Sequence, residues 1–336
     1  MKSTEEKYIK RCLELAKNGL GTTYPNPLVG SVVVYQNEII GEGWHKKSGE
    51  PHAEVNAIHS VKDKSLLSKS TIYVSLEPCS HFGKTPPCCD LIIANTIPNV
   101  VIGTTDPFAQ VSGNGIKKLV EAGIAVKVGI LEQECNALNK RFFTFHNKKR
   151  PYVILKWAES QDGFIAPLSK EKKEPIWITN EISRQLVHKW RSEEQAILVG
   201  TNTVIDDNPS LTTRDWTGNN PIRIVLDQNN RILKENHIFD SQAKTISISK
   251  DTIDFNRNVA SEITKYLFES TIQSVIIEGG RQTLQTFIDE GIWDEARVFI
   301  GNCHLKDGIK APNILCNYIT KRPIQDDELL IFFNHD

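Results

Sequence analysis

The sequence predicts a two-domain protein of the α/β class. Short apolar runs of strand character alternate with amphipathic helical segments along the chain, which is the pattern of α/β folds. Its 336 residues exceed what one hydrophobic core usually serves. The polar segment HNKKRP at 146–151 has the composition of a connection between compact units. We therefore expect one domain over residues 1–147 and a second over 148–336.

The first domain is expected to open with a helix over residues 3–19. Ser3 and Glu6 have the spacing of a capping box, and Gly19 can end the helix. Further expected elements are a hairpin of strands 29–35 and 39–41, a helix over 53–61, a strand over 71–76, a helix over 90–95 and a strand over 100–103.

The second domain begins a new series of alternating elements. Apolar runs rich in Val, Ile and Leu predict its strands, and amphipathic periodicity predicts its helices. The expected strands are 152–157, 196–199, 222–226, 275–277 and 296–300, and the expected helices are 180–191 and 282–290.

Composition and charge narrow the class of function. Hydrophobic residues make up 39% of the chain and charged residues 24%, as in ordinary globular proteins. The N-terminus is charged, and no run approaches the ~20 apolar residues of a membrane span, so we expect a cytoplasmic protein without a membrane partner. The 40 basic and 41 acidic side chains nearly balance, which favours a small-molecule substrate over nucleic acid.

The most informative motif combines His52 and Glu54 with Cys79 and Cys88. One imidazole and two thiolates suit zinc, and three protein ligands leave a fourth tetrahedral position for water. Zinc lowers the pKa of bound water from about 16 to near 7. Glu54, as a carboxylate that does not bind the metal, can then move the proton to a leaving amine. His-x-Glu followed by Pro-Cys and a second Cys is the signature of zinc nucleobase deaminases.

The surroundings of the two cysteines support this interpretation. Cys88 directly precedes the helix expected at Asp90, and a helix N-terminus favours thiolate over thiol. Cys89 is expected to point inward as a small apolar residue. The alternative is a structural zinc site or unconnected core cysteines, but a closed zinc site needs a fourth ligand and has no use for Glu54.

Several motifs together resemble the bifunctional deaminase/reductase family of riboflavin biosynthesis. They are HAE at 52–54, LEPCSH at 76–81, TPPCC at 85–89, PNP at 25–27, GWH at 43–45 and DP at 106–107. The eight-residue interval between Cys79 and Cys88 is typical of that family. The resemblance implies a cytidine-deaminase-like three-layer α/β/α domain followed by a dihydrofolate-reductase-like α/β domain.

The resemblance also implies the substrate. It is a diamino-pyrimidinone with a ribosylamino phosphate, deaminated in the first domain and reduced with NADPH to a ribityl chain in the second. In the first domain, Asn26 and His45 match positions that line the pyrimidine pocket. His81 and Lys84 lie between the two cysteines, where their side chains can contact a phosphate or the edge of the base.

The reductase positions rest on the resemblance, because no Gly-x-Gly-x-x-Gly follows a strand. Glycines 279 and 280 join a strand to a helix, where backbone N–H groups can approach a phosphate. The expected cofactor contacts are Ala158, Trp177, Thr203, Asp207, Gly280, Arg281, Gln282 and Thr283. The expected substrate contacts are Lys156, Arg191, Leu211, Arg214 and Glu278.

Two features depart from the family pattern: Ala158 replaces a frequent glycine, and residues 300–304 replace a usual Ala-Pro-Lys run. Two alternatives stay open: a zinc deaminase of RNA or free cytidine with an unrelated second domain, and a non-catalytic zinc-stabilised module. The intact Glu54 argues against the second. The expected partners are a small-molecule substrate and a second copy of the chain, bound through the reductase domain.

Overall fold

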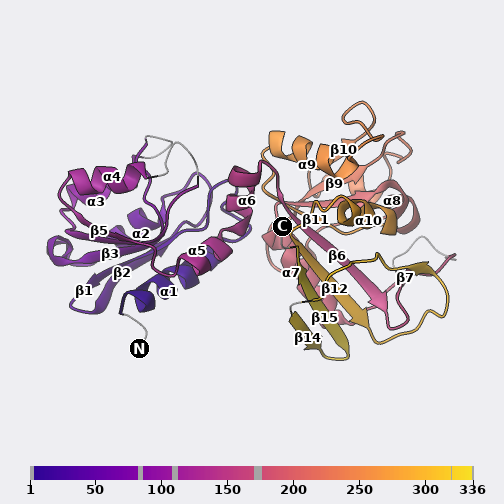
Figure 1. The fold of residues 1–336 in the computed structure, drawn as a ribbon, viewed down its shortest axis with the longest axis horizontal. Helices are drawn as coiled ribbons and strands as arrows, with labels where there is room; N and C mark the ends of the chain where they lie inside the picture. The colour runs from indigo at the N-terminus through magenta and orange to yellow at the C-terminus, as the bar shows by residue number, and fades with distance from the viewer. Residues whose placement is uncertain (1–3, 82–85, 108–112, 170–175, 319, 335–336) are drawn as a thin grey trace. The chain divides into compact units, whose positions relative to one another are not determined.

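The computed structural model describes residues 4–81, 86–107, 113–169, 176–318 and 320–334. The chain divides into two compact units, one up to Lys148 and one from Lys149, and each is described by itself (Figure 1). Within the described ranges, no helix combines the length and the apolar character that crossing a membrane requires.

The first unit is built on a five-stranded sheet of order β2-β1-β3-β4-β5. Strand β1 pairs antiparallel with β2 and β3, whereas β3, β4 and β5 run parallel. The strands are β1 (Gly30–Tyr35), β2 (Glu38–Trp44), β3 (Thr71–Leu76), β4 (Asn99–Thr104) and β5 (Ala125–Val128).

Helices cover both faces of this sheet and make three layers (Figure 1). One core is formed with α2 (Ala53–Ser60), α3 (Cys88–Ala94) and α4 (Asn114–Glu121). On the other face, α1 (Thr4–Ala16) and α5 (Glu132–Leu138) supply Ile9, Cys12 and Cys135 to a second core. The remaining helical segments are 3₁₀ turns Lys17–Gly19 and Lys64–Lys69, and α6 (Lys140–Lys148).

The second unit is built on an eight-stranded sheet of order β10-β9-β8-β11-β6-β12-β15-β14. The first six strands in that order are parallel, and β15 and β14 add antiparallel. The strands are β6 (Tyr152–Ser160), β8 (Ala196–Gly200), β9 (Ile222–Leu226), β10 (Thr245–Ile248), β11 (Ser274–Ile277), β12 (Glu295–Gly301), β14 (Thr320–Ile324) and β15 (Asp327–Phe333). A small separate sheet pairs β7 (Phe164–Ala166) with β13 (Ile309–Lys310).

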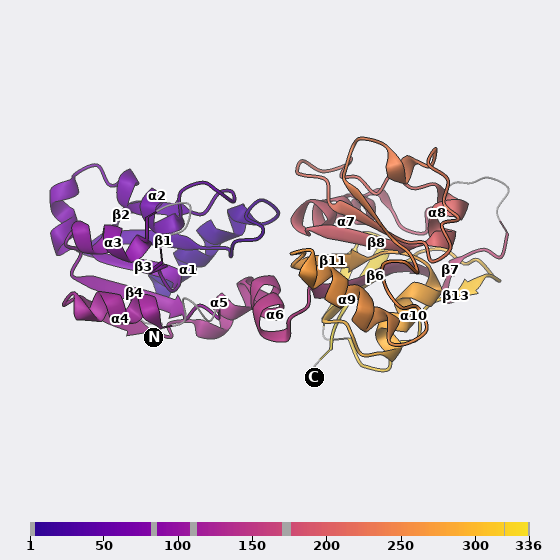
Figure 2. The same ribbon diagram turned by 90° about the horizontal axis from the view of Figure 1, so that it is seen from above.

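Two pairs of helices enclose this larger sheet (Figure 2). Helices α7 (Glu181–Glu193) and α8 (Thr201–Asp207) pack on one face through Val187, Trp190 and Val204. Helices α9 (Val259–Glu269) and α10 (Arg281–Asp289) pack on the other face. A 3₁₀ turn covers His237–Phe239.

The α/β class is confirmed, and each predicted helix and strand has a counterpart within a few residues. Helix α3, however, begins at Cys88, so Cys88 is its first residue and does not precede it. Arg191 lies inside α7 and not at its end. The sequence analysis did not predict β5, β7, β10, β13, β14 and β15 or the helices α4, α5, α6, α8 and α9. For β14 the reason is exposure of its first four residues, because an exposed strand lacks the apolar alternation that reveals a strand.

Candidate functional site

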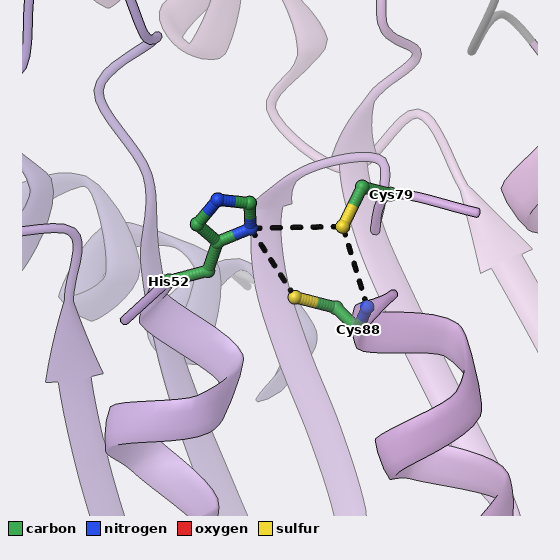
Figure 3. Close-up of side chains that lie close together, drawn as sticks. All are labelled: His52, Cys79 and Cys88. Atoms are coloured by element: carbon green, nitrogen blue, oxygen red, sulfur yellow. Dashed lines mark hydrogen bonds between the residues drawn. The ribbon is translucent and has the colours of Figure 1, made fainter. Parts of the chain in front are cut away.

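The first candidate site lies where three chain segments of the first unit meet (Figure 3). His52 is the N-cap of α2 in an extended conformation. Cys79 follows the end of β3 by three residues, and Cys88 opens α3. Two helix N-termini and the carboxyl end of a central strand therefore bring the three side chains together.

The cluster has the dimensions of a zinc site. The Nδ1 atom of His52 lies 3.6 Å from Cys79 Sγ and 3.4 Å from Cys88 Sγ, and the three donor atoms all lie within 4.8 Å of one another. Zinc–nitrogen bonds of about 2.0–2.1 Å and zinc–sulfur bonds of about 2.3 Å place such atoms roughly 3.6 Å apart in a tetrahedral site. The donor set and its spacing therefore fit a zinc ion with one further position available.

The two cysteines also contact each other directly. The backbone N–H of Cys88 donates to Cys79 Sγ over 3.3 Å. The side-chain hydrogen bond from Cys88 lowers the pKa of Cys79 and raises that of Cys88. The free N–H group at the first residue of α3 thus points at Cys79, and the expected thiolate at Cys88 stays a prediction.

Glu54 lies in the first turn of α2 and is only 3% exposed. Burial raises the pKa of its carboxyl to about 7. A carboxyl that titrates near neutrality can both accept and release a proton. The side chain lies close enough to Cys88 for a hydrogen bond, and so stands beside the metal ligands.

Asn26 and His45 meet beside this cluster. Asn26 Nδ2 lies 3.0 Å from His45 Nε2, and His45 Nδ1 lies 3.2 Å from the carbonyl of Pro51. Burial lowers the pKa of His45, so its neutral ring donates from Nδ1 and accepts at Nε2. This arrangement leaves Asn26 Oδ1 available to accept a hydrogen bond. His81 is exposed, and Lys84 lies outside the described residues.

Glu77 was missed by the sequence analysis although it lies two residues before Cys79. Its two carboxylate oxygens accept the backbone N–H groups of Asp106, Gly113, Gly115 and Ile116 over 2.9–3.3 Å. The side chain is 4% exposed. It thus fixes the start of α4 against the segment that carries Cys79, and its signal was a charged residue at the end of an apolar strand.

The second candidate site is a charged cluster in the second unit. Arg191 Nη2 donates to Glu278 Oε2 over 2.6 Å, and Arg191 Nε contacts Glu278 Oε1 at 3.4 Å. Burial would raise the pKa of Glu278, but Arg191 and Lys156 outweigh it and lower that pKa. Burial lowers the pKa of Lys156, and Glu278 opposes the shift. The structure therefore brings Lys156, Arg191 and Glu278 together.

A loop after α8 brings further predicted residues to this cluster. Leu211 is buried with a left-handed φ of 51°, and the next residue, Thr212, accepts a hydrogen bond from Arg191 Nη1 over 3.2 Å. Arg214 reaches solvent. Burial, followed by the Arg191 charge, lowers the pKa of Arg214, so two guanidinium groups act on each other here.

The predicted cofactor positions fall into two groups, and the first group surrounds the glycine turn at residues 279–280. A Cβ on Gly279 would lie 2.9 Å from Thr203 Oγ1, and one on Gly200 would lie 2.7 Å from Thr283 Oγ1. Gly280 has a left-handed φ of 68° and caps α10, where Arg281 and Gln282 are exposed.

The other predicted cofactor positions are not joined to this glycine turn by a described contact. Ala158 packs against the core on the α7 side of the sheet, and Asp207 is the last residue of α8. Trp177 is 57% exposed and stacks on Arg184 at 5.0 Å.

Two family models match the chain, one in each unit. The model of the cytidine and deoxycytidylate deaminase zinc-binding region matches residues 2–104. The model of the RibD C-terminal domain matches residues 151–305.

Curated relatives match over both units. Riboflavin biosynthesis protein RibD of Aquifex aeolicus is 39% identical over 99% of this chain and 99% of its own length. Riboflavin biosynthesis protein RibD of Escherichia coli is 36% identical over 88% of this chain and 87% of its own length.

Solved structures also match over both units. A diaminohydroxyphosphoribosylaminopyrimidine deaminase/5-amino-6-(5-phosphoribosylamino)uracil reductase from Thermotoga maritima is 37% identical, with a TM-score of 0.88 and 99% coverage of both chains. RibD from Acinetobacter baumannii is 30% identical, with a TM-score of 0.87 and 99% coverage of both chains.

Proposed function

The chain belongs to the RibD family of bifunctional riboflavin biosynthesis proteins, and from this membership we propose a division of labour between its two units. The protein is a zinc-dependent deaminase and an NADPH-dependent reductase. The unit up to Lys148 deaminates a diamino-ribosylamino-pyrimidinone phosphate, and the unit from Lys149 reduces the ribosyl side chain to ribityl. The matches of the two family models to separate halves support this assignment.

In the first unit, His52, Cys79 and Cys88 hold the metal. When bound, zinc supplies a Lewis acid that makes water a nucleophile near neutral pH. Glu54 takes the proton of the attacking water and delivers it to the departing amine. Asn26, held by His45, accepts an N–H of the pyrimidine ring at Oδ1.

In the second unit, charged side chains hold the sugar phosphate. NADPH supplies the hydride, so the protein needs no nucleophile of its own. Arg191 and Arg214 bind the phosphate, since guanidinium groups match its geometry. Lys156 and Glu278 orient the opened sugar. The glycine turn before α10 directs backbone N–H groups at a cofactor phosphate.

The observation that carries the proposal is the His52, Cys79 and Cys88 cluster with zinc-site spacing beside a buried carboxyl. The test supplies the diamino-pyrimidinone ribosylamino phosphate and follows ammonia release and NADPH oxidation separately. Both signals are expected from the same chain. Ammonia without NADPH oxidation would remove the assignment of the second unit, and no ammonia would remove that of the first.

We also propose that the enzyme works in the cytoplasm, binds neither nucleic acid nor membrane, and self-associates through the second unit. The near balance of 40 basic and 41 acidic side chains supports a small-molecule partner. Sedimentation of the intact chain measures its oligomeric state, and a strictly monomeric chain at working concentration would contradict the self-association.

A further inference from the structure

Helix α7 holds the loop at residues 212–215 with three side chains from one face. Arg184 Nε donates to Asp215 Oδ2 over 2.8 Å, and Arg191 Nη1 donates to the Thr212 carbonyl over 3.2 Å. Between them, His188 Nδ1 accepts the backbone N–H of Arg214 over 3.0 Å. Residues at positions i, i+4 and i+7 share a helix face, so α7 presents these three contacts as one row.

The contact at His188 fixes the protonation state of its ring. A backbone N–H can only donate, so Nδ1 must carry a lone pair, and the proton of the neutral ring lies on Nε2. Nε2 faces Asp215 Oδ2 at 3.6 Å. The side chain is 2% exposed. Both ring nitrogens are therefore directed at the loop, and neither is left to act on a substrate.

The Arg214 side chain depends on this backbone contact for its direction. Among the described residues, its guanidinium makes one long hydrogen bond, 3.5 Å from Nη1 to Thr212 Oγ1. Such a contact is too long to hold the group firmly. The guanidinium is thus held mainly through its own main chain, close to Arg191, where an anion would relieve the repulsion between the two cations.

We propose that His188 is a positioning residue for recognition of the substrate phosphate: by holding the Arg214 main chain, it keeps the Arg214 guanidinium beside that of Arg191. The inference rests on the proposed function, which assigns the phosphate to these two arginines. His188 touches neither substrate nor cofactor in this role. It acts only through Arg214.

The test compares variants of His188 that differ in where they offer an acceptor. In His188→Asn, the amide oxygen lies near the place of Nδ1 and keeps an acceptor for the Arg214 N–H. In His188→Gln, the polar end of the side chain lies near the place of Nε2. The Arg214 N–H therefore loses its acceptor, although the side chain stays polar. His188→Leu removes the acceptor altogether.

The measurements are KM and kcat of the reductase with the phosphorylated substrate and with its dephosphorylated counterpart. Leaving one such partly buried N–H without an acceptor corresponds to roughly a 5- to 150-fold effect. We expect KM for the phosphorylated substrate to rise about 10-fold in His188→Gln and His188→Leu. The kcat value, KM for the dephosphorylated compound and KM for NADPH should change little, and His188→Asn should restore most of the affinity.

Several outcomes would overturn the inference. A merely structural role would lower kcat and weaken both substrates alike, without rescue by Asn. Deaminase activity of the same chains reports on the first unit and separates local from global damage. If His188→Leu does not fold, His188→Gln carries the test.

Arg214→Gln distinguishes the inference about His188 from the proposed function, in which Arg214 binds the substrate phosphate. If this variant keeps its preference for the phosphorylated substrate, the proposed role of Arg214 is wrong. If Arg214→Gln loses that preference and the His188 variants keep it, only the inference about His188 is wrong.

Discussion

The two candidate sites are built in opposite ways. The metal cluster of the first unit takes three ligands from two short stretches, residue 52 and residues 79–88. One imidazole nitrogen and two thiolate sulfurs are by themselves a donor set that indicates zinc. The charged cluster of the second unit collects Lys156, Arg191 and Glu278 from β6, α7 and the end of β11. A site defined by metal ligands can thus be recognised in a sequence, whereas a site of ordinary charged residues becomes visible only when the fold brings them together.

Removal of a metal ligand should give the largest difference between the activities of the two sites. Cys88→Ala is expected to lower deamination on the order of 10⁴-fold or more, because without zinc no nucleophile forms at neutral pH. Reduction should continue when the already deaminated intermediate is supplied directly, since the reductase site lies in the other unit. Zinc content, ammonia release and NADPH oxidation measure the three effects. Cys89→Ala is the matched control: Cys89 lies in the hydrophobic core and its loss should leave zinc bound. Equal loss of both activities would contradict independent sites.

Glu54→Gln separates metal binding from proton transfer within the first site. The variant should keep zinc and the fold, because Glu54 is not a ligand, while ammonia release falls about 10²- to 10⁴-fold. Metal analysis and a deaminase assay on the same sample test both points. Undiminished deamination would remove the proton shuttle from the mechanism.

Glu278→Gln tests how far the second site depends on charge balance. The substitution leaves Lys156 and Arg191 without their shared carboxylate, and breaking a buried ion pair typically costs about 3–5 kcal/mol. We expect a loss of this order in the free energy of unfolding of the second unit, measured by denaturant titration, and loss of reductase activity. Unchanged stability would mean that solvent screens the cluster.

Acid should weaken the second unit through His188. Burial, with the charges of Arg191 and Arg214, lowers its pKa to about 4, while Asp215 and Glu278 oppose the shift. Below about pH 6.5 the His188 imidazole binds a proton in the unfolded chain but stays neutral in the folded unit. The free energy of unfolding should therefore fall as the pH drops from about 6.5 to 4. Denaturation at pH 7 and pH 5 should show a smaller difference in His188→Asn than in the wild type. Parallel curves would contradict this origin.

The smallest effect is expected at the outer end of the row on α7. Arg184 and Asp215 form an ion pair with side chains 33% and 37% exposed, and such pairs contribute about 0–1 kcal/mol. Arg184→Ala should therefore change the melting temperature of the second unit only slightly, and less at high salt. A large loss would show that this pair, and not His188, holds the loop.

The limits of sequence-based prediction follow the same contrast. The positions of His52, Cys79 and Cys88 next to helix and strand ends could be predicted because capping and apolar runs mark those ends. The contact of the Cys88 N–H with Cys79 Sγ could not be predicted, since it depends on the direction of one N–H group. Glu77 lies inside the LEPCSH motif at 76–81, but that motif does not show what its carboxylate contacts, and His188 lies in none of the motifs. Their roles come from contacts with main-chain groups 29–39 and 26 residues away, which no local pattern encodes.

The pair of sulfurs at Cys79 and Cys88 has a consequence for metal supply. A metal ion binds both sulfurs as thiolates, so each ion taken up displaces the protons of the thiols into the medium. Loading is therefore an exchange, in which hydrogen ions and zinc ions compete for one pair of sulfurs. Zinc binding by the deaminase unit should therefore weaken as the pH falls.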